Sequence, residues 1–304
     1  MMNIDEWTIT KAVHDVNAGC KDERLKTVMT SLVRHLHDFA REVQLTEKEW
    51  MVGIEFLTDT GHISDDKRQE FILLSDTLGL STLVTAQNNA KPPGCTEATV
   101  FGPFHLEDAP DFENGDDISN GAKGEPCYVS GQVRGLDGEP VPGAAMSIWQ
   151  ADEEGFYDVQ RPELDWRQAR GNLKSLPDGR FHFKAVVAAP YPIPDDGPVG
   201  KMLAALGRHS WRPAHLHFMI TAPGYERLVT HVFRDDSKYL ESDAVFGVRS
   251  SLISKWERHA PGNAPDGTKS KLPFYTLAYD FILNPIAKKV AKSVSSKRSN
   301  RLPT

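Results

Sequence analysis

Two histidines separated by a single residue, His215 and His217, form the pattern in this sequence best suited to binding a metal ion. They lie in RPAHLHFMI (212–220), a segment of high β propensity. Residues two apart share one face of a strand, so both imidazoles can reach one ion while Leu216 points into the opposite layer. On its own the pattern is weak evidence, because histidines that alternate in a core also occur, and it requires further ligands.

His35 and His37 have the same spacing but lie inside a helical pattern. Two residues along a helix correspond to a rotation of about 200°, so the two rings point to different faces. We therefore interpret this second pair as helix-surface or domain-contact residues.

Tyr157 in DEEGFYDVQ and Tyr191 in AAPYPIPDDGP are candidate partners for the strand histidines. Each follows a predicted strand and lies in a turn or loop, where functional side chains concentrate. Phenolate is a hard anionic donor, and two phenolates with two imidazoles would stabilise ferric over ferrous iron. Spacing alone does not choose these two from the seven tyrosines of the chain. A half-buried ring with a hydrogen-bonded hydroxyl is the alternative for each.

The elements that must position these residues begin with a helical segment over residues 1–90. A second helix within it opens with the capping-box residues Thr46 and Glu49. A third helix is expected to begin near Ser64. The expected apolar face of the first long helix consists of Leu25, Val28, Met29, Leu32, Leu36, Phe39 and Val43, that of the second of Trp50, Ile54 and Leu57, and that of the third of Phe71, Leu74 and Leu78.

The rest of the chain is predicted to be a connector, a β domain and a tail. Residues 91–125 are rich in proline and glycine and favour an extended connector. Residues 126–285 contain five strand-like segments between turns, which favours a β-sandwich: CYVSGQVRGL, AAMSIWQA, GRFHFKAVV, AHLHFMITA and RLVTHVFRD. Residues 286–304 contain six basic residues and no acid, and are interpreted as a solvated, disordered tail. The predicted fold is mostly β with an α-helical N-terminal domain.

Composition excludes several classes of function. The 304-residue chain has a net charge of −7, so no nucleic-acid-binding surface is expected. No stretch approaches the ~18 apolar residues of a membrane span, and the first residues lack the pattern of a signal peptide. Cys20, Cys95 and Cys127 lie far apart. That spacing favours a reducing cytoplasm over a disulfide framework.

Together these motifs resemble those of the intradiol ring-cleavage dioxygenases, the family that includes catechol and hydroxyquinol 1,2-dioxygenases. The similarity covers the chain from the helical domain to about residue 284, and it is carried by TVFGPFH (99–105), GEPCYVSGQVRGLDGEPVPGA, IWQADEEGFYDVQ, PYPIPDDGPVGKMLAALGRHSWRPAHLHFMI and SDAVFGV (242–248). It implies one Fe(III) per subunit, held by Tyr157, Tyr191, His215 and His217, with hydroxide completing the coordination. It also implies a homodimer formed through the helical domains, with a phospholipid-like molecule at their interface.

The resemblance further implies the chemistry. A vicinal diol chelates the ferric ion, and both atoms of O2 enter between the two hydroxyl-bearing carbons as the ring opens. Tyr191 is expected to leave the metal and act as a base, and Arg212 to stabilise negative charge on the substrate. A structural ion pair is the alternative role for Arg212. His231 is expected to lie just outside the metal ligands.

Within the family, YPIPDDGPVG, RPAHLHFM and SDAVFGV look most like the hydroxyquinol 1,2-dioxygenases. This implies benzene-1,2,4-triol as the substrate and 3-hydroxy-cis,cis-muconate (maleylacetate) as the product. A catechol or chlorocatechol 1,2-dioxygenase is the alternative. Asp76 is hypothesised to pair with the third substrate hydroxyl, unless it belongs only to a polar helix turn. By the match, the substrate pocket is lined by Leu73, Asp76, Val100, Phe101, Gly102, Pro103, Phe104, Ile193, Pro194, Arg212 and Val245.

Three other classes of protein compete with this interpretation. A zinc hydrolase on a β-sandwich would use His215, His217 and one further ligand, but zinc sites favour His, Cys and carboxylates over tyrosines. An extradiol enzyme uses Fe(II) with two histidines and a carboxylate, which leaves the tyrosines unexplained. A non-catalytic binding module has no need of a metal or of Arg212.

Overall fold

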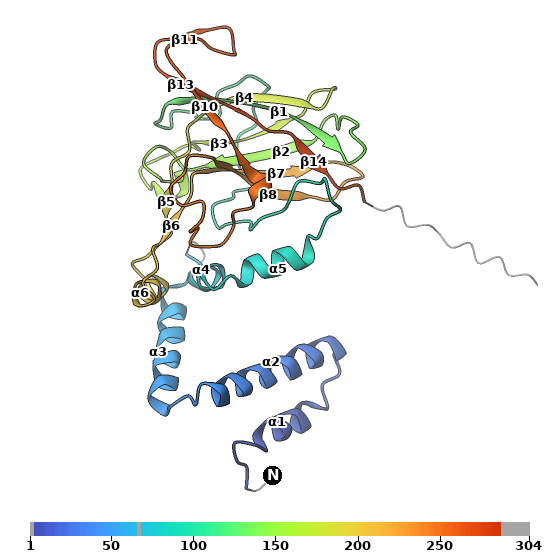
Figure 1. Cartoon of the computed structure of the whole chain (residues 1–304), viewed down its shortest axis with the longest axis vertical. Helices are drawn as coiled ribbons and strands as arrows, with labels where there is room; N and C mark the ends of the chain where they lie inside the picture. Colours follow the sequence, from blue (N-terminus) through green and yellow to red (C-terminus); the bar gives the residue numbers. More distant parts are fainter. Residues whose placement is uncertain (1–2, 66–67, 287–304) are drawn as a thin grey trace, which may run out of the picture. The chain divides into compact units, whose positions relative to one another are not determined.

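The structure, a computed structural model, describes residues 3–65 and 68–286. The chain separates into two compact units, with the division after Ile63. The first unit is helical, and the second combines three helices with two five-stranded β-sheets and two small two-stranded ones (Figure 1). The predicted tail lies almost wholly outside the described residues.

The first unit consists of α1 (Ile9–Asn17), α2 (Glu23–Glu42) and α3 (Glu47–Ile63). The Asp22 side chain caps α2 by accepting from the backbone N–H groups of Arg24 and Leu25. The predicted capping box of α3 is confirmed: the Thr46 N–H donates to Glu49 Oε2 at 2.9 Å, and the Glu49 N–H donates to Thr46 Oγ1 at 3.3 Å. Local sequence therefore fixes where these helices begin.

The apolar faces of α2 and α3 are exposed to solvent in the single chain. Trp50, Ile54 and Leu57 were predicted to point inward, and this is wrong within one chain, since 53%, 42% and 46% of their surfaces are exposed. Among the described residues of this unit only Ala12 and Thr60 are buried. Three short helices supply too little surface to bury their own apolar side chains.

The predicted third helix does not begin at Ser64. The Asp65 side chain instead accepts from the Arg68 N–H at 2.7 Å. The next helix, α4, spans Glu70–Thr77, and Gly79 at φ 76° separates it from α5 (Leu80–Asn88). Both helices belong to the second unit, so the segment predicted as one helical domain over 1–90 divides after residue 63. The predicted apolar face is also wrong in part, because Phe71 and Leu78 are exposed whereas Glu70, Asp76 and Thr77 are buried.

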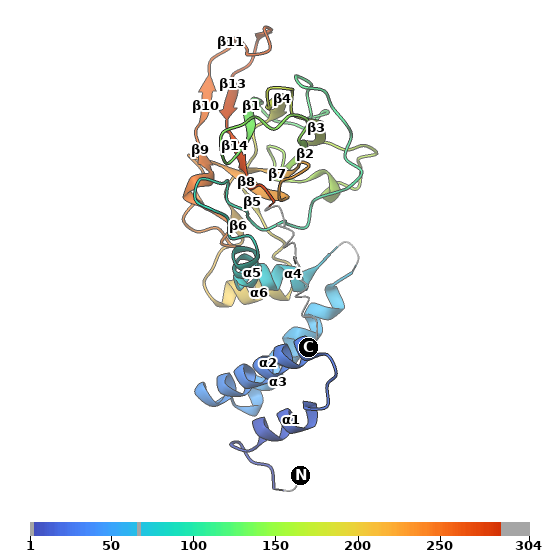
Figure 2. The same ribbon diagram turned by 90° about the vertical axis from the view of Figure 1, so that its right-hand side faces the viewer.

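The second unit is built on two five-stranded sheets that lie one above the other (Figures 1 and 2). One sheet contains β10 (Trp256–His259), β13 (Phe274–Ala278), β1 (Pro126–Gly135) and β14 (Phe281–Leu283), with β4 (Arg180–Val186) paired to β1. The other has the order β3 (Arg170–Lys174), β2 (Ala145–Gln150), β7 (His215–Thr221), β8 (Leu228–Arg234) and β9 (Ile253–Ser254). Apolar side chains from both sheets meet in one core, as at the rings of Phe218 and Phe281, whose centroids are 4.7 Å apart. This is the predicted β-sandwich.

The smaller elements lie around the sandwich. β5 (Tyr191–Pro192) pairs with β6 (Trp211–Arg212), and β11 (Gly262–Asn263) pairs with β12 (Lys269–Ser270). The helix α6 (Pro198–Ala205) lies with α4 and α5 on one side of the sheets (Figure 2). The 3₁₀ turns are η1 (Asp158–Gln160) and η2 (Ser250–Leu252). Residues 89–125 contain neither helix nor strand, as the predicted connector requires, although Asp111 and Asp117 form isolated bridges to β3 and β4.

The five predicted strands are confirmed as β1, β2, β4, β7 and β8. The elements not predicted are β3, the short strands β5 and β6, the strands after residue 250 and the helix α6, which begins with Pro198 after Gly197. Tyr191, expected in a turn or loop, lies on β5. Within the described ranges, no helix is both long and apolar enough to cross a membrane.

Candidate active site

The two strand histidines lie on β7, between β2 and β8. Their Nε2 atoms are 3.0 Å apart, and both side chains are buried. Leu216, between them, points into the core between the sheets. The predicted alternation is therefore confirmed: one face of β7 forms the core and the other carries the two imidazoles.

Two tyrosines bring their hydroxyl groups to the same point. The Tyr157 hydroxyl is 3.0 Å from His217 Nε2 and 3.4 Å from the Tyr191 hydroxyl. Tyr157 comes from the turn after β2 and Tyr191 from β5, and both are buried. The structure thus brings together the two oxygen and two nitrogen donors that the sequence analysis selected.

The donor atoms are arranged to hold a cation. His215 Nδ1 lies 2.7 Å from the Pro213 carbonyl; donation of its N–H to that oxygen leaves Nε2 as the free lone pair. Burial, and then the Arg212 charge, lowers the pKa of His215 to about 3, so the imidazole is neutral at pH 7. Burial also raises the pKa of Tyr157 well above its ordinary value, and a bound cation would reverse that effect. Neutral imidazoles and buried phenols of this kind fit a metal site.

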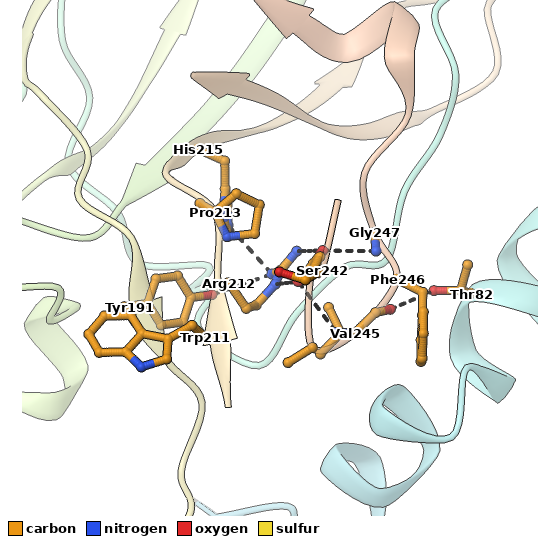
Figure 3. Close-up of polar contacts among 12 residues, drawn as sticks. Thr82, Tyr191, Trp211, Arg212, Pro213, His215, Ser242, Val245, Phe246 and Gly247 are labelled. Carbon is orange, nitrogen blue, oxygen red and sulfur yellow. Dashed lines mark hydrogen bonds and ion pairs between the residues drawn. The ribbon is translucent and has the colours of Figure 1, made fainter. Parts of the chain in front are cut away.

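Arg212 occupies the edge of this donor cluster (Figure 3). Its Nη1 donates to the Tyr191 hydroxyl at 3.3 Å and lies 3.5 Å from His215 Nε2. Its Nε donates to Asp243 Oδ1 at 3.1 Å, and Asp243 also accepts from the Gly247 N–H. Burial raises the pKa of Asp243, but Arg212 outweighs that effect, so the net pKa is lowered and the pair is ionic. The structural ion pair is therefore present, and the same guanidinium also reaches Tyr191 and His215; the active-site role of Arg212 stays a prediction.

His231 completes a group of three histidines. It lies opposite His217 in the β7–β8 register, with ring centroids 4.2 Å apart. One ligand atom from each of His215, His217 and His231 lies within 4.8 Å of the others. His231 is buried, and neither ring nitrogen has a hydrogen-bond partner. Its position next to the donor cluster agrees with the expected place just outside the metal ligands.

A cavity of about 230 Å³ opens beside Tyr191 and Arg212. All but one of the residues expected to line the substrate pocket do so: Leu73, Asp76, Val100, Gly102, Pro103, Phe104, Ile193, Pro194, Arg212 and Val245. The exception is Phe101, whose ring turns away to pack against His105 and Trp149 at centroid distances of 4.9 and 5.9 Å. Because the Phe101 ring packs on His105 and Trp149, it does not line the cavity, although its neighbours Val100 and Gly102 do.

Gly102 is required where the cavity approaches the donors. Its φ is 75°, and a Cβ at this position would lie 3.3 Å from His217 Cε1. Any side chain here would strain the backbone and press on a candidate metal ligand.

Comparison with known proteins identifies the chain. A family model described as "Dioxygenase" matches residues 100–285, and one described as "Catechol dioxygenase N terminus" matches residues 22–96. The 6-chlorohydroxyquinol 1,2-dioxygenase of Cupriavidus pinatubonensis is 62% identical over 285 residues, which cover 94% of this chain and 99% of that protein. The hydroxyquinol 1,2-dioxygenase of Nocardioides simplex is 53% identical over 87% of this chain and 90% of that protein. The chain belongs to the intradiol ring-cleavage dioxygenases.

A solved structure supports the same assignment. The hydroxyquinol 1,2-dioxygenase of Pseudomonas putida DLL-E4 matches this intradiol dioxygenase with a TM-score of 0.87 and 47% identity, over 92% of this chain and 99% of that one. The helical first unit and the sandwich are therefore the family's fold. The zinc hydrolase, the extradiol enzyme and the non-catalytic module are set aside as classes for this chain.

Several residues of the dioxygenase site were not found by sequence reasoning. Glu70, Gln160, Arg68, Gln69 and Ile72 also line the cavity. Asp243 lies within SDAVFGV, a segment already singled out, but it is 31 residues from Arg212 in the sequence, so no local pattern indicated their pairing. Trp149 stacks on His217 with centroids 4.6 Å apart and planes 15° apart, and its place on the strand β2 gave no signal of that contact.

Proposed function

We propose that this intradiol dioxygenase cleaves hydroxyquinol (benzene-1,2,4-triol) with O2 to give 3-hydroxy-cis,cis-muconate, the tautomer of maleylacetate. The observation that carries the substrate assignment is the buried carboxyl group of Asp76 in a largely apolar cavity beside Tyr191 and Arg212. The printed names of the relatives from Cupriavidus, Nocardioides and Pseudomonas, all hydroxyquinol-type enzymes, support it.

Tyr157, Tyr191, His215 and His217 are the residues we propose to hold one Fe(III) per subunit. Two phenol oxygens and two neutral imidazoles meet within hydrogen-bond distance, and hard anionic oxygen donors favour the ferric ion. A ferric ion bound there would supply Lewis acidity that makes the diol ring reactive toward O2.

Tyr191 and Arg212 have complementary tasks in this proposal. The Tyr191 oxygen is the acceptor for one proton of the substrate diol. Arg212 Nη1, 3.3 Å from that oxygen, stabilises negative charge that develops on the substrate beside it. Because the guanidinium is fixed by Asp243 and shielded from water, its charge needs little reorganisation during the reaction.

Asp76 is proposed to select the triol. Burial raises the pKa of this carboxyl group, although Ser81 and Arg212 act in the opposite direction. A third hydroxyl on the ring gives the carboxyl group a hydrogen-bond partner in addition to Ser81, and catechol does not supply it. A polar group that loses its partner in a buried site is penalised more than one missing contact suggests.

A chlorinated triol is the second candidate substrate. The relative with 62% identity is, by its name, a 6-chlorohydroxyquinol 1,2-dioxygenase. Parallel kinetics with 6-chlorohydroxyquinol and the unsubstituted triol would rank the two.

The deciding experiment is mass spectrometry of the product formed from benzene-1,2,4-triol under 18O2, with catechol in parallel. Two labelled oxygens in a ring-opened C6 diacid, formed faster from the triol, are expected. Faster turnover of catechol would overturn the substrate assignment but keep intradiol cleavage. Metal analysis of the same preparation should find iron, and its visible spectrum should show a phenolate–iron charge-transfer band that makes the protein red. A colourless zinc protein would overturn the proposed ferric site.

We also propose a cytoplasmic homodimer that forms through the helical segment and holds a phospholipid-like molecule there. The support is the row of exposed apolar side chains on α2 and α3, a surface that in one chain faces water. Analytical ultracentrifugation should give twice the chain mass, and native mass spectrometry should show an extra mass that organic solvent removes. A lipid-free monomer would overturn this proposal.

A further inference from the structure

A buried ion pair lies directly behind the candidate metal donors. Arg170 on β3 pairs with Asp158, the residue after Tyr157, and both side chains are almost wholly buried. Arg170 Nε lies 3.0 and 2.8 Å from the two carboxylate oxygens of Asp158, and Nη2 donates to Oδ1 as well. Burying two charges costs free energy that their attraction only partly offsets, so the pair is better explained by the arrangement it imposes than by stability.

The same guanidinium has a second partner in the cavity wall. Arg170 Nη1 donates to the Phe104 carbonyl at 2.9 Å. Phe104 lines the cavity, and its ring stacks on that of Tyr157 with centroids 4.3 Å apart and planes 24° apart. Arg170 therefore joins the turn that carries Tyr157 to the segment that carries Phe104, although these segments are more than fifty residues apart in the sequence.

The sheet register places Arg170 in line with the site. Arg170 lies opposite Trp149, Trp149 lies opposite His217, and His217 lies opposite His231 across β3, β2, β7 and β8. Directly opposed residues share one face of an antiparallel sheet. Trp149 stacks on His217, whose Nδ1 has no hydrogen-bond partner, so packing along this row holds that imidazole.

We propose that Arg170 is a positioning residue of this enzyme: by binding Asp158 and the Phe104 carbonyl at once, it fixes the Phe104 ring against Tyr157 and so sets the shape of the substrate cavity. The assignment builds on the proposed function. It requires the planar fork of arginine, because a lysine ammonium is a single point of charge and cannot reproduce both sets of contacts in the same geometry.

If Arg170 only stabilised the fold, its substitution would have different effects. Loss of a residue that only stabilises the fold lowers the melting temperature and the yield of folded enzyme. The enzyme that does fold keeps its KM and its spectrum. A positioning residue changes the folded enzyme itself. Arg170→Lys separates the two, because it keeps the positive charge beside Asp158. Arg170→Met leaves the buried carboxylate without its ion-pair partner, with only the N–H groups of Val159 and Gln168 donating to it among the described residues, and so puts folding itself at risk.

The test compares Arg170→Lys with Lys91→Met in the metal-loaded enzyme. Lys91 is a matched control, because its side chain is also buried and ion-paired, to Glu226 at 2.9 Å, but does not line this cavity. For Arg170→Lys we expect an unchanged metal content, a KM for the triol raised roughly tenfold or more, and a shifted phenolate charge-transfer band. Lys91→Met should keep the wild-type KM and band.

A crystal structure of metal-free Arg170→Lys supplies a readout independent of turnover. The Phe104 ring should move away from Tyr157, whereas the sandwich core stays in place. A wild-type KM, band and Phe104 position in Arg170→Lys would overturn the proposal. Absence of triol turnover by the wild-type enzyme would overturn the proposed function instead, and the Phe104 position and the metal-bound spectrum would still decide the role of Arg170.

Discussion

His35 and His37 lie on α2, and His215 and His217 lie on β7, with one residue between the partners in both pairs. On the helix, His37 Nδ1 contacts Thr10 Oγ1 at 2.9 Å, whereas His35 Nε2 contacts the neighbouring Arg34. On the strand, the two Nε2 atoms face each other at 3.0 Å. The identical spacing thus gives two unrelated local environments, and the backbone geometry decides which pair can share an ion.

Surroundings separate the pairs further. The strand pair lies beside two buried tyrosines, a buried arginine and a third histidine, and the helix pair has no such neighbours among the described residues. A metal site therefore needs more than a spacing: it needs a strand at the middle of a sheet and loops that bring further donors to it.

The largest expected effect comes from removing one strand histidine. His217→Ala should abolish iron retention and reduce triol turnover to that of the metal-free protein, because only three of the four proposed donors would remain. His35→Ala is the matched control and should keep both properties. Metal analysis and oxygen consumption measure the outcome; an iron-replete, active His217→Ala variant would break the comparison.

Substitution of Arg212 tests how much its guanidinium adds to catalysis at the site of the strand histidines. Arg212→Lys keeps a positive charge near Asp243 but loses the fork that also reaches Tyr191. We expect kcat to fall by about 10²–10³-fold with iron content unchanged, because the lost interaction serves the transition state. Steady-state kinetics with the triol test this expectation, and a fall in KM alone would contradict it.

Asp76 tests the substrate end of the same site. Asp76→Ala should lower the preference for triol over catechol in kcat/KM by roughly 10- to 100-fold, since a hydrogen bond to a buried carboxyl group contributes about 1–3 kcal/mol. Catechol turnover itself should fall little or rise. Equal losses for both substrates would show that Asp76 is only structural.

The smallest expected effect is on stability in acid. The folded pKa of His215 is lowered to about 3 from an ordinary 6.5, so between these values the unfolded chain binds more protons. The free energy of unfolding of the metal-free protein should therefore fall as the pH is lowered from about 6.5, and recover as it is raised. Urea unfolding between pH 7 and 4.5 measures the slope. His215→Gln should reduce it, although burial also lowers the pKa values of His217 and His231, and His35→Gln should leave it unchanged.

Much of the fold follows from local sequence. The strands β1, β2, β4, β7 and β8 follow from period-two alternation, and α3 begins at its predicted capping box. The predictions were wrong where tertiary contacts overrode a local sequence signal. A helix was expected to begin near Ser64, but the Asp65 side chain accepts from the Arg68 N–H, and α4 begins at Glu70. This helix buries the polar Glu70 and Asp76, whereas Phe71 is exposed.

Only part of the candidate site could be predicted from local sequence. The two histidines follow from strand geometry, whereas the choice of Tyr157 and Tyr191 from seven tyrosines required the family resemblance. Asp243 and Arg170 act through partners far away in the sequence, so no local pattern marks them. The prediction for Phe101 was wrong because the resemblance named the whole run from Val100 to Phe104, whereas the Phe101 ring packs on His105 and Trp149 instead of lining the cavity.

The strand β7 has a consequence for how this enzyme can change. Leu216 belongs to the core between the sheets, and its two neighbours in the sequence are the candidate metal ligands. A substitution that repacks the core at this position therefore also displaces both imidazoles, so stability and reactivity cannot be altered independently along this strand. Variation that adapts the enzyme to new ring substituents is accordingly expected in the segments around the cavity, at positions such as Leu73 and Val245, while the middle of β7 stays constant.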